Sequence, residues 1–145
     1  MTTAFIYQAN LSSHSLGEAH PMKPSRLRYT YELLNALQAF ENPDSLLLCG
    51  REATAKEILS FHSSEYVNAV AAADGGDSHL NFNKFNLGSS DNPTYRGIYQ
   101  AALLSTGATM KAVDLILDGS VESAFSISGV LHHAMPHYAS GFCIF

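Results

Sequence analysis

The sequence has little charge, few basic residues and no long hydrophobic run. Of its 145 residues 14% are charged and 46% are hydrophobic, which argues against disorder and favours a buried core. Lys and Arg total 8 against 13 Asp and Glu, so we expect no nucleic-acid partner. No apolar run approaches the roughly 18–20 residues that cross a bilayer, and no signal-peptide pattern opens the chain. We therefore expect no membrane partner and a cytoplasmic protein.

Cysteine is also scarce, since the chain holds only Cys49 and Cys143. The absence of a C-x-x-C motif leaves a disulfide framework or a cysteine zinc site without support. Each cysteine lies in an apolar stretch, and free cysteine is among the most buried residue types. We expect two buried thiols.

Hydrophobic periodicity and turn residues predict alternating strands and helices. Thr54 and Glu57 have the capping-box spacing that marks a helix start. The predicted order is a strand at 5–7, a helix from Pro24 to the Asn42-Pro43 break, a strand at 45–49, short helices at about 54–59 and 65–73, a loop at 78–90, a long helix from Asn92-Pro93 to about Leu117, and a strand at 124–128. This alternation predicts one α/β domain with a small parallel sheet of about three strands flanked by helices.

Two adjacent histidines, His132 and His133, follow the last predicted strand. Ligands gather beyond the carboxyl ends of the strands in open α/β sheets. One imidazole could accept a proton from water while its charged neighbour stabilises negative charge. Adjacent histidines in loops are more often plain polar residues, so this pattern alone is a weak signal for catalysis. A hydrolase using Ser128 or Ser140 as nucleophile is a weaker reading, because no G-x-S-x-G elbow is present.

Four segments give a family resemblance. They are HPMKPSRLR at 20–28, FHSSEYV at 61–67, DNP at 91–93 before a helix containing LSTG at 104–107, and GVLHHA at 129–134 with SGFC at 140–143. In order and spacing they resemble histone deacetylases, acetoin-utilisation proteins and acetylpolyamine amidohydrolases. The resemblance implies part of an arginase/deacetylase-like, three-layer α/β fold.

The resemblance also implies roles for individual residues. His132 and His133 fall on the family's tandem active-site histidines, which act as general base and electrostatic catalyst. Asp91 falls on a rim carboxylate that accepts hydrogen bonds from the substrate backbone. The remaining positions are Gly141 and Phe142 on the wall of the acyl-lysine tunnel, and Arg26 and Gly129 at the inner cavity.

Zinc serves the complete family enzyme, and the resemblance places its ligands beyond the tandem histidines. They are an Asp-x-His pair and a further Asp, and a carbonyl-polarising Tyr follows near the carboxyl end. The sequence stops at Phe145, before these positions. We therefore expect residues 1–145 to be an incomplete amino-terminal portion of one domain, with no second domain, no metal ligands of its own and little or no deacetylase activity.

Two interpretations of the chain remain open. It could be a fragment of a zinc-dependent enzyme that hydrolyses an acetyl amide, with acetyl-lysine or an acetylpolyamine as substrate. It could instead be a complete, non-catalytic α/β module that binds a protein or a small ligand. In either case the predicted third strand at 124–128 has an apolar edge that invites pairing with another chain. We expect a homodimer or higher oligomer formed through this edge.

Overall fold

Three short parallel strands form the centre of the molecule. The computed structural model describes residues 1–14, 16–18, 20–75, 81–128 and 132–145. In the sheet, β1 (Thr3–Tyr7) lies between β2 (Ser45–Cys49) and β3 (Ser123–Ser126). Both pairings are parallel, and Phe5 of β1 is opposite Leu47 on one side and Phe125 on the other. The predicted three-stranded parallel α/β sheet is confirmed.

The helices lie before, between and around these strands. They are the 3-10 turn η1 (Ala9–Ser12), α1 (Ser25–Ala36), α2 (Ala55–Leu59), α3 (Ser64–Asp74), the 3-10 turn η2 (Phe82–Phe85) and α4 (Ile98–Leu117). The predicted capping box is confirmed, because the Thr54 side chain accepts the Glu57 amide while the Glu57 carboxylate accepts the Thr54 amide. Helix α3 is capped in a similar way, because the Ser63 side chain accepts the Tyr66 amide, so α2 and α3 begin where a side chain satisfies one of their first amides.

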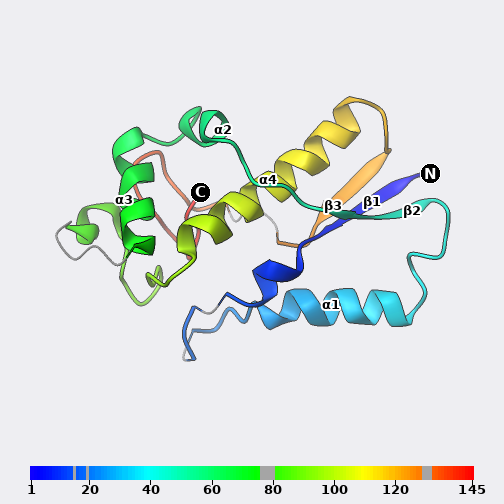
Figure 1. Cartoon of the computed structure of the whole chain (residues 1–145), viewed down its shortest axis with the longest axis horizontal. Helices are drawn as coiled ribbons and strands as arrows, with labels where there is room; N and C mark the ends of the chain where they lie inside the picture. Colours follow the sequence, from blue (N-terminus) through cyan, green and yellow to red (C-terminus); the bar gives the residue numbers. More distant parts are fainter. Residues whose placement is uncertain (15, 19, 76–80, 129–131) are drawn as a thin grey trace.

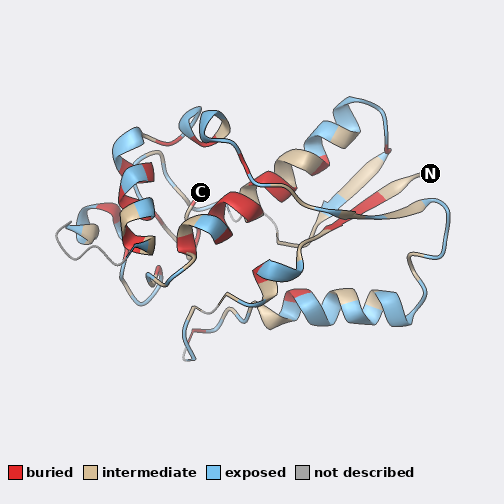
Figure 2. Cartoon of the chain, viewed as in Figure 1, coloured by how far each residue is buried: buried red, intermediate tan, exposed pale blue. Residues whose placement is uncertain are grey.

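The sheet is the middle layer between α4 and α1 (Figure 1). On the α4 face, Ala4 and Ile6 of β1 pack in one cluster with Ala108 and Ala112. On the α1 side, the Tyr31 ring stacks on Tyr7 with ring centroids 4.4 Å apart. Burial follows this arrangement, since the outer surface of α1 is exposed while the middle of α4 is buried (Figure 2). Helix α4 therefore packs against the sheet along part of its length, and its other end packs in a second core.

A second core lies at the other end of α4, against α2, α3 and the carboxyl-terminal segment. Tyr66 of α3 is fully buried there, and its hydroxyl donates to the Ile144 carbonyl at 2.6 Å. Ala139 and Phe145 pack in the same cluster. The segment that follows the tandem histidines is therefore tied to α3 rather than to the sheet.

The start of α4 was predicted six residues too early. The helix begins at Ile98 rather than at Asn92-Pro93, because Gly97 has a φ of 90° and cannot lie in a right-handed helix. Glycine adopts this left-handed conformation without the steric cost that other residues incur. The Gly97 amide donates to the Asp74 carboxylate, which fixes the chain as it enters the helix.

Other local predictions were wrong in part. Helix α1 ends at Ala36, before the expected Asn42-Pro43 stop, and Leu37 is 68% exposed. The predicted loop at 78–90 contains η2 within its described part. Cys143 is buried as expected, whereas Cys49 is exposed because it ends an edge strand. These misses arise where neighbouring elements, not local pattern, decide the environment.

Gly107 allows α4 to cross close to the segment after β2. A Cβ atom at this position would lie 2.1 Å from the Arg51 carbonyl oxygen and 2.4 Å from the Ala53 nitrogen. The Ala53 amide donates to the Leu103 carbonyl at 2.9 Å, so this segment is bonded to α4. Glycine at this position therefore lets the two segments approach this closely.

Gly107→Ala should lower the free energy of unfolding by about 1–3 kcal/mol, because backbone must shift to admit the methyl group. Without the clash, the same change in a helix would stabilise by about 1 kcal/mol. The measurement is urea unfolding followed by circular dichroism. Gly75→Ala is the matched control, because its added Cβ would meet only ordinary contacts starting at 3.5 Å. A stabilised Gly107→Ala protein would contradict the close crossing.

His62 joins α3 to the segment after the tandem histidines. The side chain is 6% exposed, and its Nδ1 lies 3.1 Å from the Met135 carbonyl oxygen, to which the neutral ring donates. The aromatic rings of Phe61, Tyr66 and Phe145 surround it. Burial lowers the pKa of His62, although the bond to Met135 acts in the opposite direction.

Because the pKa of His62 is lowered, the free energy of unfolding should fall in acid. The lowered pKa means that the unfolded chain binds more protons, so the contribution of His62 is complete above about pH 6.5 and is lost as the pH falls below that value. His62→Gln should flatten the dependence of unfolding free energy on pH between 5 and 7, measured by urea titration. The exposed His137 provides the control His137→Gln. An unchanged slope in His62→Gln would refute this account.

Candidate functional site

The tandem histidines lie in the segment that leaves β3. Residues 129–131 lie outside the described part of the chain, and so does the predicted inner-cavity residue Gly129. His132 and His133 are both exposed, and their ring centroids are 4.1 Å apart. Two imidazoles at this separation can act on the same small molecule, one by accepting a proton and the other by charge.

A tight turn at residues 140–143 lies beside the histidines. Ser140 and Cys143 exchange backbone hydrogen bonds of 2.9 and 3.2 Å across it. The two central residues, Gly141 and Phe142, each have a φ of 54°. This is the pattern of a type I′ turn, in which both central residues are left-handed. Phe142 is an unfavourable residue for that conformation, so contacts from elsewhere must hold it.

Gly141 supports the ring of His133. A Cβ atom on Gly141 would lie 2.6 Å from Cδ2 and 2.9 Å from Cγ of the imidazole. Such contacts are too short for any other residue, so the missing side chain makes room for the ring. The position of His133 therefore depends on glycine at 141.

Cys143 ties the turn to the histidine segment. Its Sγ lies 3.2 Å from the Gly141 carbonyl oxygen, to which the thiol donates. Burial raises the pKa of Cys143, although hydrogen bonds from the His133 and Ala134 backbone lower it in part. A raised pKa keeps the sulfur protonated near neutral pH, which argues against a thiolate nucleophile or metal ligand.

Two further segments reach the turn. The Asp91 carboxylate accepts the Gly141 amide at 3.0 Å. The ring of buried His20 lies edge-on to Phe142, with centroids 5.6 Å apart, and its Nδ1 accepts the Met22 amide at 3.1 Å. Of the predicted site residues, the structure therefore brings together Asp91, His132, His133, Gly141 and Phe142.

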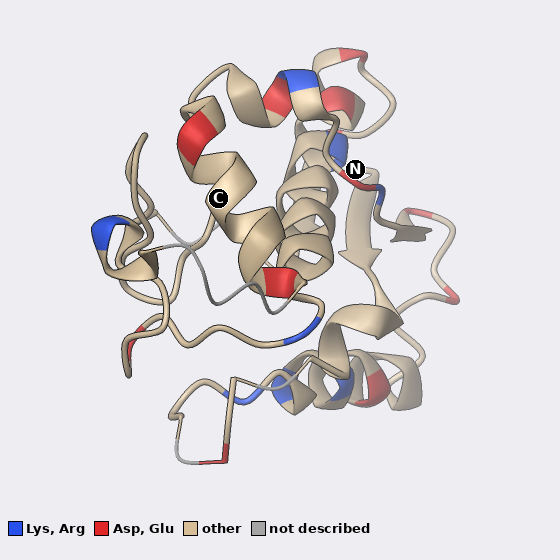
Figure 3. Cartoon of the chain, turned by 60° about the vertical axis from the view of Figure 1, so that its left-hand side comes forward, with Lys and Arg blue, Asp and Glu red and all other residues tan. Residues whose placement is uncertain are grey.

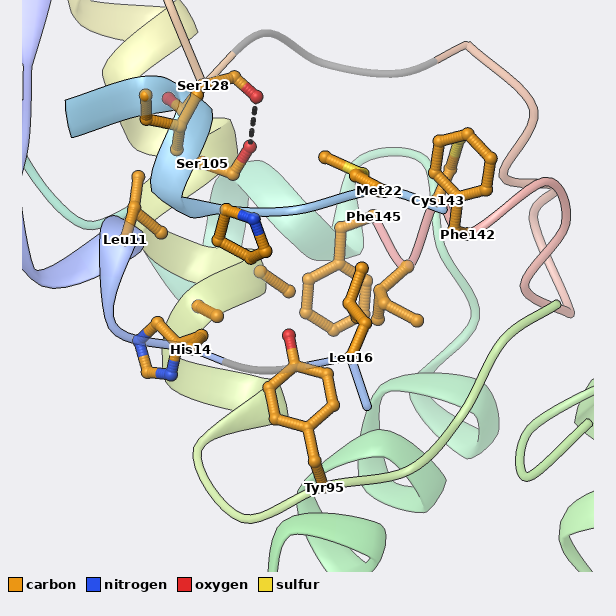
Figure 4. A pocket seen from close by; sticks show the side chains of 15 residues that line it. Leu11, His14, Leu16, Met22, Tyr95, Ser105, Ser128, Phe142, Cys143 and Phe145 are labelled. Atoms are coloured by element: carbon orange, nitrogen blue, oxygen red, sulfur yellow. Dashed lines mark hydrogen bonds between the residues drawn. The ribbon is translucent and has the colours of Figure 1, made fainter. Parts of the chain in front are cut away.

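A pocket of about 100 Å³ opens beside the turn (Figure 4). Its wall is mostly apolar and includes Met22 and Phe142, while the Tyr95 hydroxyl points inward and the His14 ring lies at one side. Arg26, predicted at the inner cavity, is exposed and is not among the lining residues. The lining residues are Leu11, His14, Leu16, Met22, Pro24, Leu27, Tyr95, Ala101, Ala102, Ser105, Ser128, Phe142, Cys143, Ile144 and Phe145.

His14 and Tyr95 were missed by the sequence analysis. Burial lowers the pKa of His14, although Asp74 acts in the opposite direction, so the imidazole is neutral near pH 7. Burial, with a smaller effect from Asp74, raises the pKa of Tyr95 to about 12. Both can serve the pocket as neutral hydrogen-bonding groups. Their segments, a polar loop and the approach to α4, carry no pattern that marks a pocket.

The described part of the chain bears on metal binding. It contains no group of three or more His, Cys, Asp or Glu side chains that could hold a metal ion. The described residues therefore do not form the three-ligand site that catalytic zinc requires. One Asp-x-His triplet, Asp77-Ser78-His79, occurs in the sequence before the tandem histidines, whereas the resemblance places the metal-binding pair after them. That triplet lies outside the described residues.

The distribution of charge on the surface does not indicate a particular class of partner. Basic and acidic residues are spread over several helices and loops rather than gathered by sign (Figure 3). Among the described residues, no helix is long and apolar enough to cross a membrane.

Known proteins resemble the chain over most of its length. The histone deacetylase domain matches residues 20–145. The chain is 32% identical to the acetoin utilization protein AcuC of Bacillus subtilis (strain 168), over 99% of this chain and 37% of that protein. It is 29% identical to the histone deacetylase RPD3 of Saccharomyces cerevisiae, over 97% of this chain and 32% of RPD3.

The fold also resembles that of a solved structure. The crystal structure of an HDAC homolog from Aquifex aeolicus superimposes with a TM-score of 0.87 at 28% identity, over 99% of this chain and 38% of that chain. The chain thus spans little more than a third of the length of these relatives. Because the family domain covers most of the chain and the fold matches, the chain belongs to the histone deacetylase family.

Proposed function

We propose that residues 1–145 supply the tandem-histidine part of an amide hydrolase site, and that the whole protein removes acetyl groups from lysine or a polyamine. The observation that carries this proposal is the pair of exposed imidazoles beside the Gly141–Phe142 turn. Family membership supports the reaction class. We also propose that these residues are the amino-terminal part of a single deacetylase-like domain.

In this reaction one imidazole accepts a proton from the attacking water and later returns a proton to the leaving amine. The second imidazole, when charged, stabilises the negative charge that develops on the carbonyl oxygen. His133 is the better-positioned of the two, because its ring rests on Gly141. The Phe142 ring, held edge-on to His20, offers an apolar surface to a methylene chain.

We assign no step to zinc, because the described residues do not form its ligand set. If zinc serves the whole protein, its ligands come from outside the described residues. The resemblance places those ligands after the tandem histidines and beyond Phe145, so we expect a hydrolysis that needs them to be absent from residues 1–145 alone. This is the reason for proposing little or no activity for the chain by itself.

The test measures acetyl-lysine hydrolysis with added zinc. The 145-residue chain should show no turnover above that of its His132→Ala/His133→Ala double variant. In the full reading frame that contains this chain, either single substitution should lower kcat/KM by about 10²–10⁴-fold, the usual contribution of a general acid or base. His137→Ala, at an exposed nearby histidine, should change it less than about twofold.

Two outcomes would contradict the proposal. Turnover by the short chain that the double variant loses, together with stoichiometric zinc, would show that residues 1–145 form a complete site. Full activity of the histidine variants in the full reading frame would remove the tandem histidines from the chemistry.

We propose as a second function that the chain pairs with another copy of itself through the open edge of β3. This strand is at the edge of the sheet, and its Phe125 is 56% exposed. Unpaired amides and carbonyls along such an edge favour addition of another strand. This reading needs no catalysis and corresponds to a non-catalytic oligomeric module.

Sedimentation velocity tests the pairing. The chain should sediment as a dimer or larger oligomer at micromolar concentration, and Phe125→Lys should shift it toward monomer, because an edge lysine opposes strand addition. Leu117→Lys is the matched control, since Leu117 is an 80% exposed apolar residue on α4 rather than on the sheet. A monomer at high concentration for the unaltered chain would refute the pairing.

A further inference from the structure

Asp91 lies fifty positions before the turn that it contacts. Its Oδ2 atom accepts the amide of Gly141 at 3.0 Å. The two hydrogen bonds within the turn join Ser140 and Cys143, so they leave the Gly141 amide unused. A carboxylate is a strong acceptor for a backbone amide, and here it supplies the partner that the turn itself lacks.

The turn has a conformation that needs this external hold. Phe142 has a φ of 54°, which a bulky residue rarely adopts. The His20 ring contacts its side chain, while the Asp91 carboxylate binds the preceding amide. Strained backbone persists only when its surroundings fix it from several sides.

The turn in its left-handed form is also what supports His133. The imidazole packs so close to Gly141 that an added Cβ would be 2.6 Å from its Cδ2 atom. Any movement of Gly141 toward a more relaxed conformation would change this contact. The chain of contacts therefore runs from the Asp91 carboxylate through the Gly141 backbone to the His133 ring.

We propose that Asp91 is a positioning residue for His133. It acts through the Gly141–Phe142 turn, and this role is separate from any contact of Asp91 with substrate. The inference deepens the proposed function, since it says how one of the two histidines is placed. It is tested on the substrate-free chain, so a failure to detect hydrolysis would leave it standing.

The experiment uses nuclear magnetic resonance on the labelled 145-residue chain. In Asp91→Ala, hydrogen exchange at the Gly141 amide should rise at least about tenfold, and the His133 ring resonances should move. The resonances of exposed His137 should stay in place. Asp91→Asn keeps a side-chain oxygen acceptor and should restore most of the amide protection and the His133 resonances.

Asp118→Ala is the matched control, because Asp118 also accepts a backbone amide, that of Ser120 at 2.8 Å, in the turn that follows α4. It should leave Gly141 and His133 unchanged. The proposal is overturned if Asp91→Ala alters neither the exchange nor the ring resonances. It is also overturned if its changes spread through both cores with a lower Tm, since Asp91 would then be a general stabilising residue.

Discussion

The left-handed turn at Gly141–Phe142 is the constraint on which the candidate site depends. Three segments meet at it: the loop of His20, the loop of Asp91 and the tandem histidines. Glycine at 141 adopts a positive φ at little steric cost and leaves the space that the His133 ring fills.

The rest of the fold holds in place the segment that leads into this turn. His62, just before α3, and Tyr66 within α3 hold the segment between the histidines and the carboxyl end, because their side chains bond to the carbonyls of Met135 and Ile144. Helix α4 then joins this second core to the sheet, and Gly107 lets it pass close to the chain that leaves β2. The segment that leaves β3 is thus held by packing near α3, at the end of the molecule away from the sheet.

Charge has a smaller part in this arrangement than hydrogen bonding and shape. His62 is neutral near pH 7 because burial lowers its pKa, and Cys143 keeps its proton because burial raises its pKa. The pocket beside the turn is likewise mostly apolar, and its polar side chains include neutral His14 and Tyr95 together with Ser105 and Ser128.

The sequence by itself determined the elements whose signals are local. The apolar run of β2 and the capping box at Thr54 were predictable because neighbouring residues create them. The four motif segments also identified the family, which the matching family domain confirms. Tertiary structure decided the rest, including the late start of α4 at Gly97 and the exposure of Cys49 on an edge strand. The bond from Asp91 to Gly141 and the pocket formed with His14 and Tyr95 join residues far apart in the chain, and no local pattern specifies such contacts.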